Sequence, residues 1–119
     1  MYSERLLEHF QHPRNVGELD DADIRVEVSN PICGDILRLT ARVERGRIVE
    51  IRYLTRGCTA SIAVGSALTE LLAGRSAAEA AAIGRDDIEQ AVGGLSNESK
   101  HAAALAIDGI RAVLGKMPE

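Results

Sequence analysis

The fold is decided by residues 36–54, which read ILRLTARVERGRIVEIRYL. Apolar residues recur through both ends of this stretch, residues 36–43 and 48–54, in a way that is typical of buried or half-buried strands. The four residues between them, 44–47, include a glycine and predict a tight turn. Strands joined by so short a turn must pair antiparallel, so the stretch predicts a hairpin.

A third strand and several helices surround this hairpin. Residues 24–28 alternate apolar and charged side chains, which predicts a strand that completes a three-stranded antiparallel sheet over residues 24–55. Ser3 is a suitable N-cap for a short first helix, and we expect His9 and His12 near the end of that helix to be surface or partner-contact residues. Helical patterns also follow the sheet. The expected helices are residues 3–11, 59–73, 76–83, 85–92 and a last one that begins after Ser96 or Asn97 and runs to about Leu114, with Gly115 beyond it.

This order of elements predicts an α+β fold. An N-terminal helix precedes the three-stranded antiparallel sheet, and we expect the later helices to pack on one face of it. The chain has 119 residues and no stretch that looks like a linker, so residues 1–119 are expected to form a single domain. Aromatic residues make up only 3% of the chain, so the core must be built from aliphatic side chains.

Composition excludes several classes of function. The formal net charge is −4, which argues against a nucleic-acid partner. No apolar run is long enough to span a bilayer and no leader resembles a signal peptide, so we expect a cytoplasmic protein without a membrane partner. The two cysteines are too few for a disulfide framework. In a reducing cytosol they are free thiols or metal ligands.

Both cysteines lie beside a glycine at the end of a predicted strand. Cys33 lies in the connection before the second strand, Asp35 follows it, and Cys58 comes just after the third strand. In an antiparallel hairpin the start of one strand and the end of the other are neighbours. We therefore expect Cys33, Asp35 and Cys58 at one edge of the sheet. Burial as small hydrophobic residues is the alternative for the two cysteines.

Cys58 also precedes a predicted helix. The unpaired N–H groups and the positive end of the helix dipole favour the thiolate there and lower the pKa of the thiol. His101 lies in the first turns of the last helix, but the sequence alone does not place it beside the cysteines. A partly exposed histidine without a metal is the alternative. Together, Cys33, Asp35, Cys58 and His101 supply the four donors of a closed tetrahedral zinc site, although their spacing is not that of a zinc finger.

Four short motifs in the chain resemble those of a known family. They are Pro13–Gly17, Cys33-Gly34-Asp35, Gly57-Cys58 and Lys100-His101, at separations similar to those of NifU-like (IscU-type) iron–sulfur cluster assembly scaffolds. The resemblance covers nearly the whole chain and implies the fold expected above. It also implies a function without catalysis. The protein would hold iron, a nascent [2Fe–2S] cluster or zinc, receive sulfur from a cysteine desulfurase and pass the cluster to iron–sulfur acceptor proteins.

The resemblance also implies which residues bind the cluster. Cys33, Cys58 and His101 match family ligands, and Asp35 matches the aspartate that keeps the cluster labile and can also bind zinc. The family's third cysteine follows the histidine directly, where this chain has Ala102; a shift of one residue would put His101 itself in that position. Neither residue can carry persulfide sulfur. The pattern therefore favours metal binding over cluster assembly, since a cluster usually takes four protein ligands and prefers thiolates.

Two other functions fit part of the pattern. Cys58 as nucleophile, His101 as base and Asp35 as orienting group would form a catalytic set, but no oxyanion motif is recognisable. A degenerate family member could instead act as a zinc-binding or desulfurase-interaction module without cluster assembly, using the N-terminal helix and Tyr2 for that contact. Residues 93–99 also lack the Leu-Pro-Pro-Val-Lys motif with which the family binds a chaperone.

Overall fold

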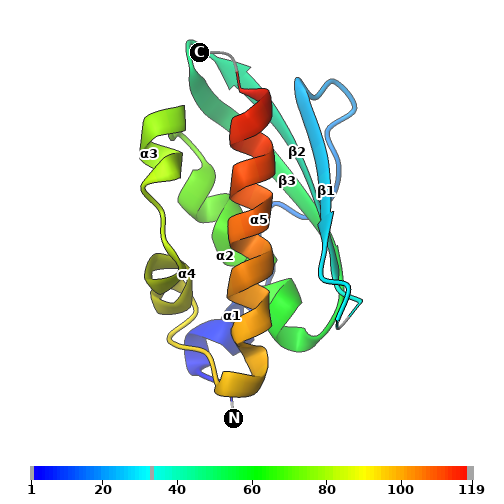
Figure 1. Cartoon of the computed structure of the whole chain (residues 1–119), viewed down its shortest axis with the longest axis vertical. Helices are drawn as coiled ribbons and strands as arrows, with labels where there is room; N and C mark the ends of the chain where they lie inside the picture. Colours follow the sequence, from blue (N-terminus) through cyan, green and yellow to red (C-terminus); the bar gives the residue numbers. More distant parts are fainter. Residues whose placement is uncertain (1, 33, 118–119) are drawn as a thin grey trace.

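The structure is a computed structural model, and it describes residues 2–32 and 34–117. A curved sheet forms one layer and the helices that follow it in the chain form the other (Figure 1). This arrangement confirms the predicted α+β fold. In chain order the elements are α1 (Glu4–Gln11), β1 (Ile24–Ser29), β2 (Ile36–Glu44), β3 (Arg47–Arg56), α2 (Thr59–Leu72), α3 (Ala77–Ala81), α4 (Arg85–Ala91), a 3-10 turn (Asn97–Ser99) and α5 (Lys100–Lys116).

β2 is the central strand of the sheet, with β1 and β3 antiparallel on either side of it. The hairpin between β2 and β3 turns at Arg45 and Gly46, whose φ angles are 53° and 75°. Two positive φ angles in succession give the turn that matches the twist of the flanking strands. The register places Ile36 opposite Arg56, so the start of β2 adjoins the end of β3, as the sequence predicts.

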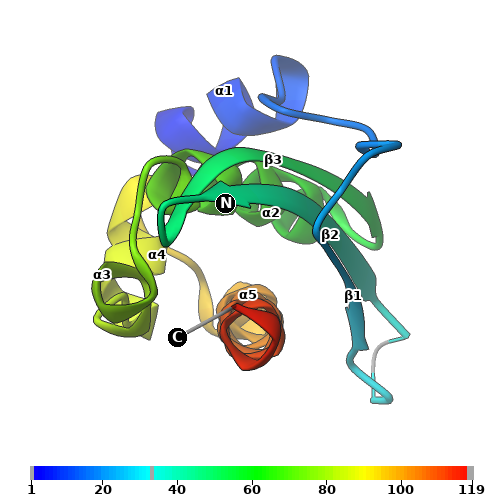
Figure 2. The same ribbon diagram turned by 90° about the horizontal axis from the view of Figure 1, so that it is seen from above.

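One face of the sheet carries the core. Leu37 and Leu39 of β2 and Tyr53 of β3 are buried, and α2 and α5 lie against this face (Figure 2). α5 approaches closely because Gly109 faces β2: a Cβ at this position would lie 3.0 Å from a methyl group of Leu37. α3 and α4 pack against α5 in turn. None of the helices described here is long and apolar enough to cross a membrane.

α1 packs mainly against α2, through a buried polar contact. Ser3 caps α1 as predicted, because its hydroxyl accepts a hydrogen bond from the N–H of Leu6. His9 is only 9% exposed, and its Nδ1 lies 2.8 Å from Ser66 Oγ. The prediction that His9 lies at the surface is therefore wrong, whereas His12 is exposed. Nothing near His9 in the sequence signals the serine on α2 that satisfies its ring.

The last helix differs from its prediction at both ends. The 3-10 turn comes first, so the α-helical part begins at Lys100 rather than directly after Ser96 or Asn97. Gly115 lies inside the helix and not beyond it. Met117 follows, 8% exposed and part of the hydrophobic core. Burial of the Met117 side chain stabilises the last turn of the helix. The prediction ended the helix before Gly115 because glycine often follows a helix, and this rule does not take such a contact into account.

The buried position of His9 makes the stability of the fold depend on pH. Burial lowers the pKa of His9 and the Arg14 charge lowers it further, while Glu70 and Glu8 act in the opposite direction. The pKa in the folded protein is thus below the ordinary value of 6.5. The stabilising contribution of neutral His9 is therefore present above that value and is lost as the pH falls through the pKa of the folded state.

We expect His9→Gln to reduce the pH dependence of stability. Between about pH 7 and about pH 5, the free energy of unfolding should fall more in the wild type than in this variant, as measured by urea denaturation. His12→Gln is the matched control, because His12 is exposed on the same segment. The free energy of unfolding of His12→Gln should depend on pH as it does in the wild type. The same pH dependence in the wild type and His9→Gln would contradict this role of His9.

Candidate metal centre

Asp35 and Cys58 lie at one end of the sheet, where β2 begins and β3 ends. Asp35 immediately precedes β2, and Cys58 is the N-cap of α2. The pairing of Ile36 with Arg56 brings the two residues together, as the hairpin predicts. Cys33 falls outside the described residues, so its place in the site stays a prediction.

α5 brings His101 to the same point. The Nε2 of His101 lies 3.6 Å from Cys58 Sγ and 3.3 Å from Asp35 Oδ2. One donor atom from each of the three residues lies within 4.8 Å of the other two. In Figure 1 the first turns of α5 lie at the same end of the molecule as the start of α2 and the β1–β2 connection. The approach of His101 is therefore a product of helix packing on the sheet.

These distances fit a single tetrahedral metal ion. Zinc bonds of about 2.3 Å to sulfur and about 2.1 Å to nitrogen or oxygen separate neighbouring sulfur and nitrogen ligands by about 3.6 Å. They separate nitrogen and oxygen ligands by about 3.4 Å. The Cys58–His101 and His101–Asp35 distances of 3.6 and 3.3 Å are close to these values, and the donor atoms of Cys58 and Asp35 lie within 4.8 Å of each other. The three side chains are thus close to the arrangement that zinc requires, and a fourth ligand would close the site.

The ring of His101 is held with Nε2 toward the other two donors. Its Nδ1 lies 3.0 Å from the carbonyl oxygen of Glu98 and donates a hydrogen bond to it. In a neutral imidazole this leaves the lone pair on Nε2, which is the form that binds a metal. A catalytic triad would use both ring nitrogens, one for the nucleophile and one for the carboxylate. Here Cys58 and Asp35 both lie beside Nε2, so the geometry favours a shared metal over a Cys-His-Asp nucleophile.

The two titratable groups at the surface of the site shift toward their charged forms. Burial raises the pKa of Cys58, but hydrogen bonds from Ser61, from His101 and from backbone N–H groups at the start of α2 outweigh it and lower the pKa overall. Burial lowers the pKa of His101, but the contacts with Cys58 and Asp35 outweigh it and raise the pKa. The thiolate is the form of Cys58 that binds metal. A protonated His101 must lose its proton, so metal affinity falls as the pH is lowered.

Asp35 is the buried member of the site, and Ser61 and Gly57 position it, a role that the sequence analysis assigned to neither residue. The Asp35 side chain is 8% exposed, and its Oδ2 accepts a hydrogen bond from Ser61 Oγ. Gly57 lies directly over the carboxylate, since a Cβ at this position would be 2.7 Å from the Asp35 carboxyl carbon. Gly57 belongs to the Gly57-Cys58 motif of the family resemblance, and Ser61 stands three residues after Cys58 in the first turn of α2.

A match over the full length of the chain shows the family to which it belongs. Residues 1–119 match the family model described as the NifU-like N terminal domain. The chain belongs to this family. The resemblance noted at Pro13–Gly17, Cys33-Gly34-Asp35 and Gly57-Cys58 is therefore confirmed.

Curated relatives of this NifU-like domain span most of its length. The iron-sulfur cluster assembly scaffold protein IscU 1 of Archaeoglobus fulgidus is 43% identical over 111 residues, which are 93% of this chain and 72% of that protein. The scaffold protein IscU of Escherichia coli is 38% identical over 117 residues, which are 95% of this chain and 91% of that protein. A NifU-like protein from Brucella abortus, solved by crystallography, has a TM-score of 0.64 over 96% of this chain and 82% of its own. At 17% identity it shows a shared fold.

The position after His101 departs from the pattern that the resemblance implies. Ala102 stands there, 2% exposed, and the chain holds two cysteines in all. The NifU-like domain therefore offers at most two thiolates to a metal or cluster. The described part of the site, Asp35, Cys58 and His101, has one donor each of oxygen, sulfur and nitrogen.

Gly57→Ala should weaken metal binding without unfolding the protein. The added methyl group would meet the Asp35 carboxylate and displace it, whereas the backbone of Gly57 needs no positive φ. Loss of a positioning contact of this kind lowers metal affinity by about 10- to 100-fold. Competition for zinc with a chromophoric chelator measures the effect.

Gly115→Ala is the matched control for this substitution. A Cβ at Gly115 meets no atom within 4 Å, so zinc affinity should match that of the wild type. If Gly57→Ala binds zinc as tightly as the wild type and Gly115→Ala do, Asp35 does not bind the metal.

Proposed function

We propose that this NifU-like domain is an iron–sulfur cluster assembly scaffold that binds iron, a [2Fe–2S] cluster or zinc. The observation that carries the proposal is the convergence of Asp35, Cys58 and the Nε2 of His101 on one point, at distances that suit a metal ion. Cys33 is the fourth ligand in this proposal. Membership of the family supports it, since curated relatives of similar length bear the name of iron–sulfur cluster assembly scaffolds.

The exposure of the site suits a cargo that is loaded and then passed on. Cys58 is exposed and His101 is half-buried, while Asp35 is buried behind them. A ligand set that is open on one side leaves the bound metal accessible to other proteins. We infer a cysteine desulfurase as the source of sulfur and iron–sulfur acceptor proteins as recipients. In this role residues 1–119 act as one scaffold domain in the cytoplasm, and not as an enzyme.

The missing third thiol favours a second candidate, a zinc-binding or desulfurase-interaction module without cluster assembly. Ala102 cannot accept persulfide sulfur, and with Cys33 the site has two thiolates, one imidazole and one carboxylate. Mixed sulfur, nitrogen and oxygen ligands are common for zinc, whereas [2Fe–2S] clusters prefer thiolates. A cluster at this site should therefore be weaker than one held by an additional cysteine.

Aerobic purification should give about one zinc ion per chain, as determined by elemental analysis. Cys33→Ser and Cys58→Ser should each lose the metal, because a hydroxyl is a poor substitute for a thiolate. Ser99→Ala is the control, since Ser99 lies near His101 but outside the donor set. A protein free of metal after supplementation with zinc or with iron would contradict the scaffold and the zinc-binding module, and would leave the desulfurase-interaction module.

Anaerobic reconstitution separates the two candidates. With desulfurase, cysteine and ferrous iron, a scaffold develops the visible absorption of a [2Fe–2S] cluster, and Ala102→Cys should raise the yield several-fold because it adds a thiolate beside His101. A zinc-binding module would bind zinc and show no cluster absorption under the same conditions, and an interaction module would show no cluster absorption either. Circular dichroism of each protein controls for folding.

A further inference from the structure

β1 is an edge strand with one partner. The sheet order leaves its outer side without a neighbouring strand among the described residues. The other edge is different, because the segment around Val16 pairs with Tyr53 of β3. β1 lies at the margin of the curved sheet, beside α5 (Figure 2). A strand edge of this kind presents N–H and C=O groups with which another strand can pair.

The backbone of β1 directs alternate residues to this free edge. The N–H of Asn30 bonds to the carbonyl oxygen of Asp35, just beyond the last pair of the β1–β2 ladder. In an antiparallel ladder every second residue exchanges hydrogen bonds with the neighbouring strand. Asn30 bonds to β2, so the residues two and four positions before it, Val28 and Val26, also direct their N–H and C=O groups toward β2. The groups left for the free edge are those of Arg25, Glu27 and Ser29.

We propose that β1 pairs antiparallel with β1 of a second copy, forming a two-fold symmetric dimer with a continuous six-stranded sheet. In such an interface each residue meets its counterpart symmetrically. With the two-fold axis at Val26, Arg25 lies opposite the partner's Glu27, and Glu27 lies opposite the partner's Arg25. Both charged pairs are then hydrogen-bonded pairs, made by residues whose backbone groups point outward.

Charge selects this register over its neighbours. A shift that keeps outward-facing residues paired places Arg25 opposite the partner's Arg25, or Glu27 opposite the partner's Glu27. Like charges directly opposite one another destabilise a strand pair, whereas opposite charges stabilise it. The sequence Arg25-Val26-Glu27 is therefore self-complementary in one register only, and it stands at the centre of the edge strand.

The apolar side of β1 is complementary in the same register. Val26 meets the partner's Val26, and Ile24 meets the partner's Val28. Val26 and Val28 are half-buried in the single copy and pack against the core, so pairing would cover apolar surface that one chain leaves exposed.

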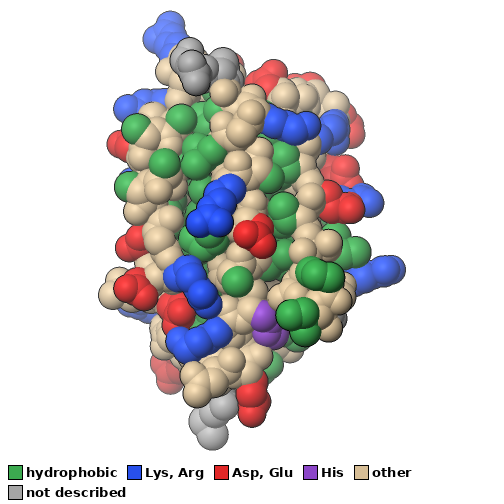
Figure 3. All heavy atoms as spheres, in the orientation of Figure 1, with side chains coloured by type: hydrophobic (Ala, Val, Ile, Leu, Met, Phe, Trp, Pro, Cys, Tyr) green, Lys and Arg blue, Asp and Glu red, His purple; other side chains and the backbone are tan. Residues whose placement is uncertain are grey.

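The space beside this edge is open. A groove of about 490 Å³ runs between β1 and α5, and Ala112 and Gly115 of the helix line it together with Val26. A Cβ at Gly115 would meet nothing within 4 Å, so these small residues leave room for a second chain. Hydrophobic side chains remain visible beside α5 in the space-filling view (Figure 3).

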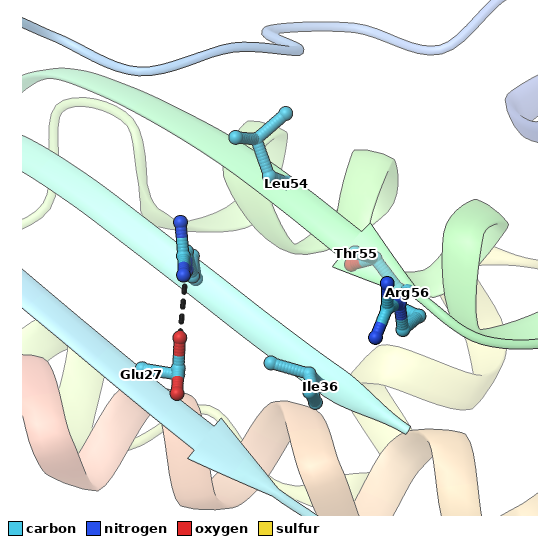
Figure 4. A pocket seen from close by; sticks show the side chains of 6 residues that line it. Glu27, Ile36, Leu54, Thr55 and Arg56 are labelled. Carbon is cyan, nitrogen blue, oxygen red and sulfur yellow. Dashed lines mark hydrogen bonds and ion pairs between the residues drawn. The ribbon is translucent and has the colours of Figure 1, made fainter. Parts of the chain in front are cut away.

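The ion pairs within one copy do not prevent this contact. Glu27 bonds to Arg38 of β2 at 2.6 Å on the outer sheet face (Figure 4), and Arg25 lies 3.6 Å from Glu18. The side chains of Glu27 and Arg25 are nevertheless about half exposed, at 51% and 49%. Exposed pairs of this kind are weak. Nη2 of Arg25 also donates hydrogen bonds to the carbonyl oxygens of Leu19 and Asp20, so Nε and Nη1 are the groups of Arg25 that remain to meet a partner.

Sedimentation equilibrium of charge-swapped variants tests the dimer. The wild type should approach twice the 12.8 kDa mass of one chain as the concentration rises. Glu27→Arg and Arg25→Glu each create two like-charge pairs and should weaken association by at least about tenfold. Mixing these two variants, or combining them in one chain, restores opposite charges and should restore the dimer. Arg42→Glu on the central strand is the matched control and should leave association unchanged.

A cross-link tests the register independently of charge. Val26 would form a non-hydrogen-bonded pair with its counterpart, whose Cα atoms lie about 4.5 Å apart, within disulfide range. Val26→Cys in a Cys33→Ser, Cys58→Ser background should therefore oxidise to a covalent dimer, while Val49→Cys on β3 in the same background should not. A wild type that stays monomeric at millimolar concentration overturns the proposal. The proposal is also overturned if the charge variants and their mixture associate as strongly as the wild type. Metal binding plays no part in these measurements, so their failure would leave the proposed function intact.

Discussion

The pairing of Ile36 with Arg56 is the contact on which the rest of the site depends. It sets the ends of β2 and β3 side by side and so brings Asp35 to Cys58. A slip of one residue would separate these ligands, and it would also turn Leu37 and Leu39 from the core to solvent. The burial of aliphatic side chains that stabilises the sheet thus also determines the distance between two candidate metal ligands.

The position of the third candidate ligand depends on how α5 lies across the sheet. Gly109 lets the helix approach β2, and eight residues earlier His101 reaches the end of the sheet. The carbonyl oxygen of Glu98 then orients the ring, so that Nε2 faces Cys58 and Asp35 together. Because a single nitrogen faces both donors, the arrangement resembles a metal site and differs from a proton relay.

The site is rigid on one side and open on the other. Asp35 is buried, hydrogen-bonded by Ser61 and covered by Gly57, whereas Cys58 is exposed. Such a combination holds the ligand geometry while leaving a bound metal accessible. With Ala102 in place of a third thiol, donor chemistry would decide between the proposed cluster and zinc, because the two differ in their preference for sulfur.

The strands, the hairpin and most helices follow from local patterns, because side-chain period, turn residues and capping residues act over a few positions. The closeness of Asp35 and Cys58 follows as well, since an antiparallel hairpin relates its own ends. The contact of His9 with Ser66 and the approach of His101 to Cys58 do not follow, because each joins residues that are distant in sequence. Such contacts exist only when whole helices have packed, and packing depends on the complementary shapes of surfaces that no local pattern encodes.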